Sequence, residues 1–451
     1  MRLSIACFVP QRLAHVFARL NELMEVNSRI PIAVESSWLR RVTRVDSLDL
    51  EGIWAIADQA VVSLGNFLTT IILARAVSPA AYGVWSVIFG LILFLNVLPS
   101  SLITYPLSVR LASGDDADAG RLIFAALALT TLLALPQALI LSGASFLISG
   151  PGLALWACVG LLFWQLQETT RRALMARMAF RTALFTDAIS YLGQAGILWL
   201  VAGNGKLTPE IGFAVIGFTC GVAAVVQWIL LRVRVQVRDV SSIQTSARTF
   251  WATGQWFLGS NLVTNFSIQA VPWALFLFRG PAEAAGFQAI SNLLGVSHPI
   301  MLSLGNIIVP AAARARAKEG FVAARRVALR HAVQGGLLLL PYFVALMIIP
   351  GYLLGLFYGS GSPYVSLGNA LRLLTVFYAL YYISLTLKFL LNALEKNRTQ
   401  FVVELCGSLL LAALLVPMVL WFGLPGAIFA TGVWLAIRMT GNVIILRQVQ
   451  T

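Results

Sequence analysis

Apolar stretches of about 20 residues recur along most of this chain, and they limit its fold more than any other feature. A helix needs about 20 apolar residues to cross the hydrocarbon core of a bilayer. We find twelve such stretches, at residues 52–74, 82–107, 121–147, 150–168, 182–203, 209–231, 250–278, 284–309, 331–357, 366–391, 399–421 and 424–446. The alternation of about 10 residues that is typical of membrane barrels is absent. The sequence therefore predicts an all-α, polytopic membrane protein with twelve transmembrane helices.

The composition excludes a soluble fold. Hydrophobic residues make up 59% of the 451 residues and charged residues only 11%, whereas soluble domains have about 25% charged residues. The 32 Lys and Arg residues against 18 Asp and Glu residues give a formal net charge of +14. In a soluble protein that charge would favour nucleic acid as a partner.

The basic residues are concentrated in alternate connections between the predicted helices. The even-numbered connections and the two tails hold 26 of the 32 Lys and Arg residues, whereas the odd-numbered connections hold only Arg75, Lys206 and Arg279. Connections rich in Lys and Arg remain in the cytoplasm under the positive-inside rule. We therefore expect both termini in the cytoplasm, and the charge is explained with no nucleic-acid partner.

Signs of catalysis are weak. The four cysteines and three histidines do not have the spacing of a zinc site or of a disulfide framework, and we find no nucleotide-binding, zinc-protease or serine-hydrolase motif. The sequence predicts a protein that is not an enzyme, with no cofactor and no metal site.

Residues 1–51 form a predicted cytoplasmic tail. Leu13, Val16, Phe17, Leu20, Leu23 and Met24 recur at helical spacing among charged residues. This pattern favours an interfacial amphipathic helix, and a loose tail is the alternative.

The two parts of the membrane region, residues 52–248 and 249–451, are predicted to be duplicated six-helix lobes. Arg75 and the following Ser78-Pro79-Ala-Ala-Tyr-Gly83 correspond to Arg279 and Gly280-Pro281-Ala-Glu-Ala-Ala-Gly286 at an offset of about 200 residues. Because each lobe has an even number of spans, the lobes should be related by an axis along the membrane normal, as a parallel repeat. Substrate would then bind between them.

The stretch Ala57-Asp58-Gln59-Ala60, followed by Asn66-Phe67 and by Leu73-Ala74-Arg75-Ala76-Val77-Ser78-Pro79-Ala80-Ala81-Tyr82-Gly83, resembles the opening of polysaccharide (O-antigen type) flippases. These belong to the multidrug/oligosaccharidyl-lipid/polysaccharide (MOP) exporter superfamily, and the architecture fits over residues 52–446. The resemblance implies a protein of the cytoplasmic (inner) membrane that flips a polyprenyl-pyrophosphate-linked oligosaccharide by alternating access, for polysaccharide or lipopolysaccharide biosynthesis. It also implies a polysaccharide polymerase or export machinery as partner, besides the lipid-linked substrate and the bilayer.

Six ionisable residues lie within the predicted spans, where each charge costs about 2.5–3.5 kcal/mol on insertion scales. The acids are Asp58, Asp187 and Glu404, all at a similar depth on the inner side, and we expect roles in coupling or gating. Asp58 could carry a coupling proton, because an apolar environment favours the neutral carboxyl. Its alternative role is structural, as a hydrogen-bonding group near the hinge between the lobes.

The embedded bases are Arg372, Lys388 and Arg438, and they are the predicted substrate-binding residues. A cation in a hydrated cavity forms strong hydrogen bonds with phosphate oxygens. Lys388 and Arg438 could instead reach the inner headgroups or pair with the three acids. Arg372 is roughly 24 Å from Lys388 along a helix and should lie in the outer half.

Other polar or aromatic residues in the spans suit a cavity that binds sugars, or else hold helices together. They are Gln59, Asn66, Gln165, Gln194, Asn261, Asn265, Gln269, Trp273 and His298. Pro272 and Pro299 are predicted to interrupt spans seven and eight.

Three alternative functions remain open. A lipid II flippase shares the architecture and the anionic lipid substrate. A drug/cation antiporter of the same superfamily should have acids in its cavity without matching cations. A membrane glycosyltransferase or polymerase normally needs a larger loop outside the membrane than this chain offers.

Overall fold

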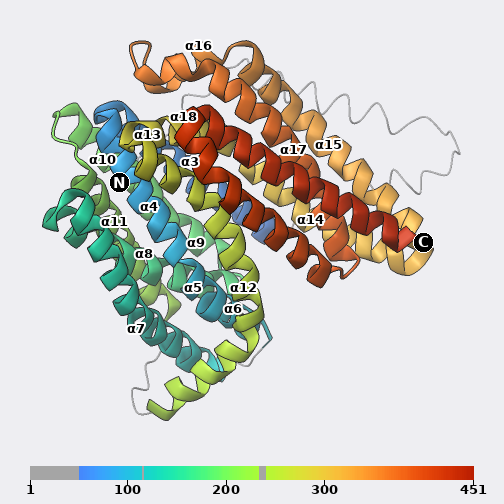
Figure 1. The fold of residues 1–451 in the computed structure, drawn as a ribbon. Coiled ribbons are helices and arrows are strands. Elements are labelled where there is room, and N and C mark those ends of the chain that lie inside the picture. The colour runs from blue at the N-terminus through green and yellow to red at the C-terminus, as the bar shows by residue number, and fades with distance from the viewer. Residues whose placement is uncertain (1–49, 114–115, 233–239, 451) are drawn as a thin grey trace, which may run out of the picture. The chain divides into compact units, whose positions relative to one another are not determined.

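A computed structural model describes residues 50–113, 116–232 and 240–450, and these residues are helical almost throughout, without strands (Figure 1). The predicted amphipathic helix in residues 1–51 lies outside the described residues, apart from the last two. The helices of the first half are α3 (Leu50–Ala76), α4 (Pro79–Leu95), α5 (Val97–Pro99), η1 (Ser100–Thr104), α6 (Tyr105–Ser113), α7 (Asp116–Ser149), α8 (Pro151–Ala176), α9 (Phe180–Asp187), η2 (Ala188–Leu192), α10 (Gly193–Gly203) and α11 (Pro209–Leu231). Those of the second half are α12 (Val240–Arg279), α13 (Pro281–Gly295), α14 (His298–Glu319), α15 (Phe321–Ile348), α16 (Pro350–Tyr358), η3 (Pro363–Leu367), α17 (Gly368–Ala393) and α18 (Asn397–Gln450).

The prediction of twelve spans in two six-helix lobes is confirmed. Nine helical stretches of the described chain are long and apolar enough to cross a membrane, and α13 with α14, bent by 49° at their junction, makes a tenth. The stretch in α18 covers 51 residues, and Gly423 divides it into two helices because its backbone has a φ of 58°. Helix α8 covers the remaining predicted span, residues 150–168, and carries several charged residues near its C-terminal end.

Local sequence signals explain several helix starts. Ser78 caps α4 by accepting a hydrogen bond from the Ala81 amide, and Pro79 occupies the first turn. Thr208 caps α11 in the same way, and again Pro209 follows. A hydroxyl at the cap and proline in the first turn are the usual signals for a helix start, because proline has no amide hydrogen to leave unpaired.

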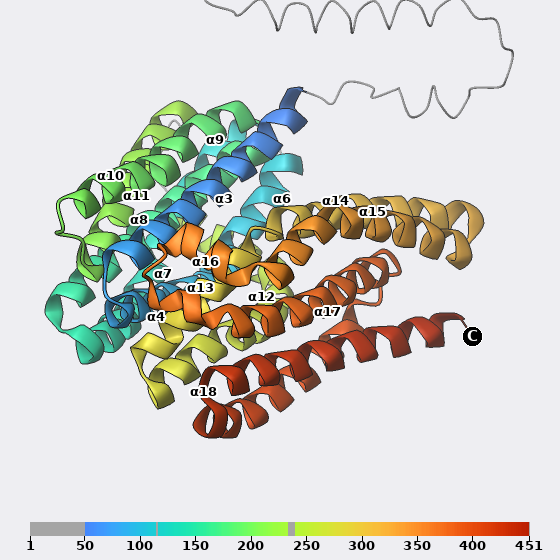
Figure 2. The ribbon, with the colours of Figure 1, turned by 90° about the horizontal axis from the view of Figure 1, so that it is seen from above.

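The two halves meet along α4 and α13 and through α12. Figures 1 and 2 show α7–α11 on one side and α14–α18 on the other, with α12 and α13 between them. Helix α12 packs on α5, α6, α7 and η1 of the first half and on α13 and α18 of the second. The duplicated Pro-Ala motifs begin α4 and α13, so the repeat found in the sequence lies where the two halves touch.

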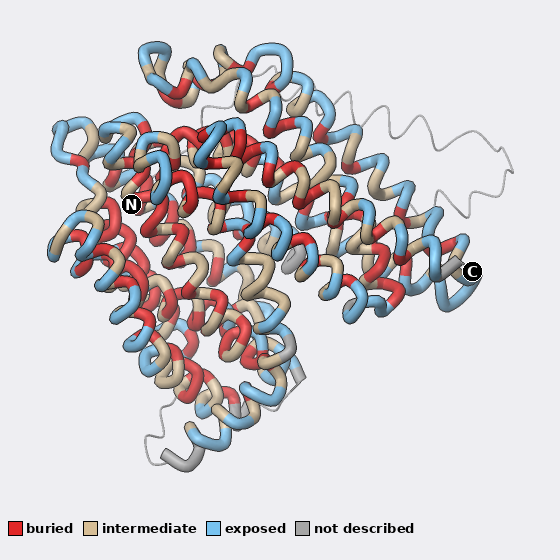
Figure 3. Tube along the Cα trace, in the orientation of Figure 1, coloured by how far each residue is buried: buried red, intermediate tan, exposed pale blue. Residues whose placement is uncertain are grey.

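Most long helices have one buried and one exposed face (Figure 3). Large apolar side chains occupy the exposed faces, including Leu147, Trp199 and Trp421. Exposed apolar surface of this extent is unfavourable in water and suits contact with lipid.

The two prolines behave differently from each other. Pro299 lies in the first turn of α14, directly after the bend that follows α13, so the predicted interruption of span eight is confirmed. Pro272 lies inside the continuous helix α12, so the predicted interruption of span seven is wrong.

Candidate substrate cavity and buried charge clusters

A cavity of about 1060 Å³ lies between the two halves. The first half contributes side chains from α3, α4, α8, η2, α10 and α11, and the second half contributes side chains from α12 to α18. Along α17 the lining runs from Leu374 to Lys388, which is roughly 20 Å of helix. The cavity can therefore hold an elongated ligand at the place predicted for the substrate.

Aromatic and amide side chains make up much of the cavity wall. Trp85 and Phe89 of α4 stack with their centroids 4.9 Å apart, and Phe89 lies 6.3 Å from Trp164 of α8. Five of the nine residues predicted for a sugar-binding wall line the cavity: Gln59, Asn66, Gln194, Gln269 and His298.

The other four polar residues of that prediction are not in the cavity lining. Gln165 donates to Gln137 within the first half, and Asn261 donates to the Ser101 hydroxyl across the two halves. The Trp273 indole donates to the Val87 carbonyl, and Asn265 donates to the Asn261 carbonyl of its own helix. Gln165, Asn261 and Trp273 therefore join helices, the alternative role expected for such residues, whereas Asn265 bonds within its own helix.

Lys388 and Arg438 supply positive charge to the cavity. The Arg438 guanidinium pairs with Glu404 at 2.7 Å and lies 4.7 Å from the centre of the Trp434 ring. The predicted pairing of Arg438 with an embedded acid is thus confirmed for Glu404. Lys388 forms no ion pair with any residue that the structure describes. Among the described residues that line the cavity, none is Asp or Glu.

Arg372 is placed apart from these two bases. It is absent from the cavity lining, and its guanidinium donates to the Met347 carbonyl at 2.9 Å and to the Asn369 side chain at 2.8 Å. These contacts fix it to the end of α15 and to its own helix.

Asp58 and Asp187 come together in the first half around Arg171. The Arg171 guanidinium contacts Asp58 at 2.8 Å and Glu168 at 3.2 Å, and its Nε donates to Asp187. Both aspartates are fully buried, and Arg171 is 5% exposed. The suggested pairing of these two acids with Lys388 or Arg438 is therefore wrong.

The neighbours of this cluster leave one charge uncompensated. Glu168 also pairs with Arg172, so three carboxylates share two guanidinium groups. Asp187 accepts hydrogen bonds from Gln167 and Gln227, whereas one carboxylate oxygen of Asp58 has no partner. The described part of the cluster therefore holds one more carboxylate than it has guanidinium groups.

Sequence reasoning missed Arg171 because it placed this residue in a cytoplasmic connection. The predicted span ends at residue 168, but α8 continues to Ala176 and keeps Arg171 within the helix packing. A signal was present, since Glu168 lies three residues before Arg171 and four before Arg172, the spacing of ion pairs along a helix.

His298 forms a second polar contact at the cavity wall. Its Nε2 lies 2.7 Å from the Tyr378 hydroxyl, and the two rings stack with centroids 5.7 Å apart. The contact joins α14 to α17.

No protein-family model and no curated protein sequence matches the chain. Solved structures do match it. Lipid II flippase MurJ in an inward closed conformation gives a TM-score of 0.69 at 15% identity, over 88% of this chain and 87% of that chain. An inward-facing multidrug resistance MATE family transporter of the MOP superfamily gives 0.62 at 14% identity, over 88% and 99%.

A third similar structure is a MOP superfamily transporter from Pyrococcus furiosus that is described as having a binding pocket of reverse polarity. Its TM-score is 0.58 at 14% identity, over 88% of this chain and 95% of that chain. All three share the arrangement of helices across nearly the whole membrane region. The chain therefore has the fold of the MOP superfamily transporters.

Proposed function

We propose that this chain is a transporter that moves a polyprenyl-pyrophosphate-linked oligosaccharide across the inner membrane by alternating access, in polysaccharide biosynthesis. The observation that carries the proposal is the charge of the cavity, because Lys388 and Arg438 are the charged residues among its described lining. Pyrophosphate is strongly anionic and binds cationic side chains through charge-assisted hydrogen bonds. The aromatic and amide wall supports a sugar portion, since hydroxyl groups need hydrogen-bonding partners and sugar rings pack on aromatic faces.

The two embedded bases have different parts in this proposal. Lys388 has no carboxylate neighbour within ion-pair distance in the described chain, so its ammonium group is available to phosphate. Arg438 is held in place by Glu404 and Trp434. Glu404, predicted as a coupling or gating residue, thereby positions Arg438. Arg372 lies outside the cavity lining and has no part in the proposed contact with phosphate.

Deletion of the gene tests the function directly. We expect lipid-linked repeat units to accumulate on the cytoplasmic face, and an unchanged lipid-linked pool would contradict the proposal. In a complemented strain, Lys388→Gln should lower export roughly 10- to 100-fold at normal protein abundance, the range for loss of one charged hydrogen bond. Lys396→Gln is the matched control, because Lys396 is exposed after α17 and outside the lining.

A lipid II flippase is the second candidate, favoured by the TM-score of 0.69 to MurJ. Both substrates carry a polyprenyl pyrophosphate, so the same two bases serve either one. Accumulation of lipid II in place of repeat units after deletion would select this candidate. A drug/cation antiporter fits less well, because cationic drugs would be repelled by Lys388 and Arg438.

We further propose that the Asp58–Asp187–Arg171 cluster couples transport to proton movement. Asp58→Asn keeps the shape of the side chain but cannot ionise, so transport in proteoliposomes should lose its response to an imposed pH gradient. Glu319→Gln, an exposed acid at the end of α14, is the control and should keep the response. A full response to the gradient in Asp58→Asn would assign the cluster a purely structural role.

A further inference from the structure

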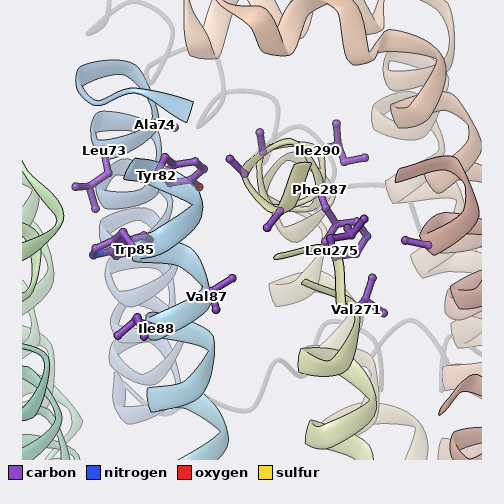
Figure 4. Close-up of a cluster of buried hydrophobic side chains, with 14 of the residues drawn as sticks. Leu73, Ala74, Tyr82, Trp85, Val87, Ile88, Val271, Leu275, Phe287 and Ile290 are labelled. Atoms are coloured by element: carbon purple, nitrogen blue, oxygen red, sulfur yellow. The ribbon is translucent and has the colours of Figure 1, made fainter. Parts of the chain in front are cut away.

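The contact between α4 and α13 is the closest meeting of the two halves. Figure 4 shows Tyr82 and Val87 on the side of α4 that faces α13, whereas Trp85 and Ile88 point away from α13. The Cα of Gly83 lies against the backbone carbonyl of Pro281 so closely that a side chain there would clash. We call the contact between residues 79–92 and 281–295 the α4–α13 seam.

One hydrogen bond in the seam joins the two halves through a buried side chain. The Asn292 amide of α13 donates to the Tyr82 hydroxyl of α4 at 2.8 Å, and Tyr82 is fully buried. The Tyr82 ring also lies 6.0 Å from Trp85 and 6.3 Å from Tyr364 of the second half. Separation of the halves at the seam must break this bond.

Asn292 also belongs to the cavity. It lines the cavity together with Gln288, which lies one helical turn earlier and donates to the Asn292 oxygen at 2.8 Å. One side chain is therefore accessible from the cavity and at the same time holds the seam closed. A ligand that binds the Asn292 amide from the cavity therefore also weakens the hydrogen bond that holds the seam closed.

The chemistry at this end of the cavity suits a neutral, hydroxyl-bearing group. Two amides at i and i+4 offer N–H donors and carbonyl acceptors, and Trp85 and Phe287 supply aromatic walls. The phosphate end is remote, because His298, six residues after Asn292, contacts Tyr378, and Lys388 lies ten residues, roughly 15 Å, further along α17. A substrate with its pyrophosphate at Lys388 would thus extend its sugars toward Asn292.

We propose that Gln288 and Asn292 form a sugar-hydroxyl subsite, and that filling it releases the α4–α13 seam by taking the hydrogen that Asn292 gives to Tyr82. This inference rests on the proposed function for the direction in which substrate enters. In this proposal the sugar portion of the substrate opens the seam in addition to being recognised. A lipid pyrophosphate without sugars therefore binds in the cavity but leaves the seam closed.

Distance measurements between spin labels test the proposal. Ala80 and Ala282 are exposed in the first turns of α4 and α13, so labels at Ala80→Cys and Ala282→Cys, with the native cysteines replaced by serine, report opening. The probes are farnesyl diphosphate and a farnesyl-diphosphate-linked oligosaccharide. We expect both to bind, and only the second to increase the ratio of open to closed seam, roughly 2- to 10-fold, the effect of one net hydrogen bond.

Three variants separate the subsite from general loosening of the seam. Tyr82→Phe lacks the bond but keeps the subsite, so the seam should open more without ligand. Asn292→Leu lacks the hydrogen bond to Tyr82 and also the amide of the subsite, so its seam should not respond to the sugar. Trp273→Phe removes the bond to the Val87 carbonyl, outside the cavity lining, and should keep the response.

The outcomes distinguish the two proposals. If neither diphosphate binds, the proposed function fails. If both bind and give the same distance distribution, or if Asn292→Leu still responds to the sugar, the proposed function stands and the subsite inference is overturned.

Discussion

Arg171 links three helices of the first half through buried ion pairs. Its guanidinium contacts carboxylates from α3, α8 and α9, and removing it would leave Asp58 and Asp187 buried without a counter-ion. Losing one partner of a buried ion pair costs about 3–5 kcal/mol, whereas an exposed pair contributes at most about 1 kcal/mol. Adjacent residues of one helix can therefore differ widely in their effect on stability.

Arg171→Met should accordingly destabilise the protein by about 3–5 kcal/mol, and Arg172→Met by less than about 1 kcal/mol. The pair is well matched, because both side chains contact Glu168 but only Arg171 is buried. Thermal unfolding in detergent, followed by size-exclusion chromatography, measures both variants. Asp58→Asn together with Asp187→Asn should partly rescue Arg171→Met. Equal melting of the two single variants would show that the cluster contributes little to stability.

The same residues show what the sequence could reveal about the site. The cost of charges in lipid drew attention to six residues. Arg372 lies outside the cavity lining, and the other five lie in a buried cluster or in the cavity wall: Asp58, Asp187, Glu404, Lys388 and Arg438. Partner choice was predictable only for Glu404 and Arg438, because depth along a helix does not specify its rotation or its neighbours. Gln288 and Asn292 gave no signal of their own, since amides are common in membrane helices.

At the scale of helices, hydropathy located the spans but not their ends. Helix α8 continues through Arg171 to Ala176, and α12 begins at Val240, ten residues before its predicted apolar stretch. The apolar pattern ends where the lipid ends, whereas backbone hydrogen bonding lets a helix continue into a polar environment. The π-helical turns η1 and η2 have no sequence signature, and one of them directly follows Asp187.

At the scale of the molecule, the duplication and the position of the cavity followed from the sequence. Six spans in each half and a repeated motif predicted a site between the halves, and the cavity lies there. How the halves touch could not be predicted, because it depends on close packing such as that of Gly83 against Pro281.

The distribution of basic residues makes a prediction about the orientation of the whole molecule. Cysteines introduced at Lys206 and Met178, both exposed in connections, should react with a membrane-impermeant reagent from opposite sides. Lys206→Cys should be labelled in intact cells, and Met178→Cys only after the cells are opened. Labelling of Lys206→Cys from the cytoplasm alone would contradict two cytoplasmic termini.

Helix α12 is long enough to connect distant parts of the molecule. Its 40 residues span roughly 60 Å, twice the thickness of the hydrocarbon core. Phe250 near its start packs with first-half residues, and Val271 and Leu275 near its end belong to the large core cluster, which contains residues of both halves. A tilt of about 10° about one end of such a rod moves the other end by roughly 10 Å. We therefore expect repacking of α12 beside the seam to displace the opposite end of the helix further than the seam itself moves.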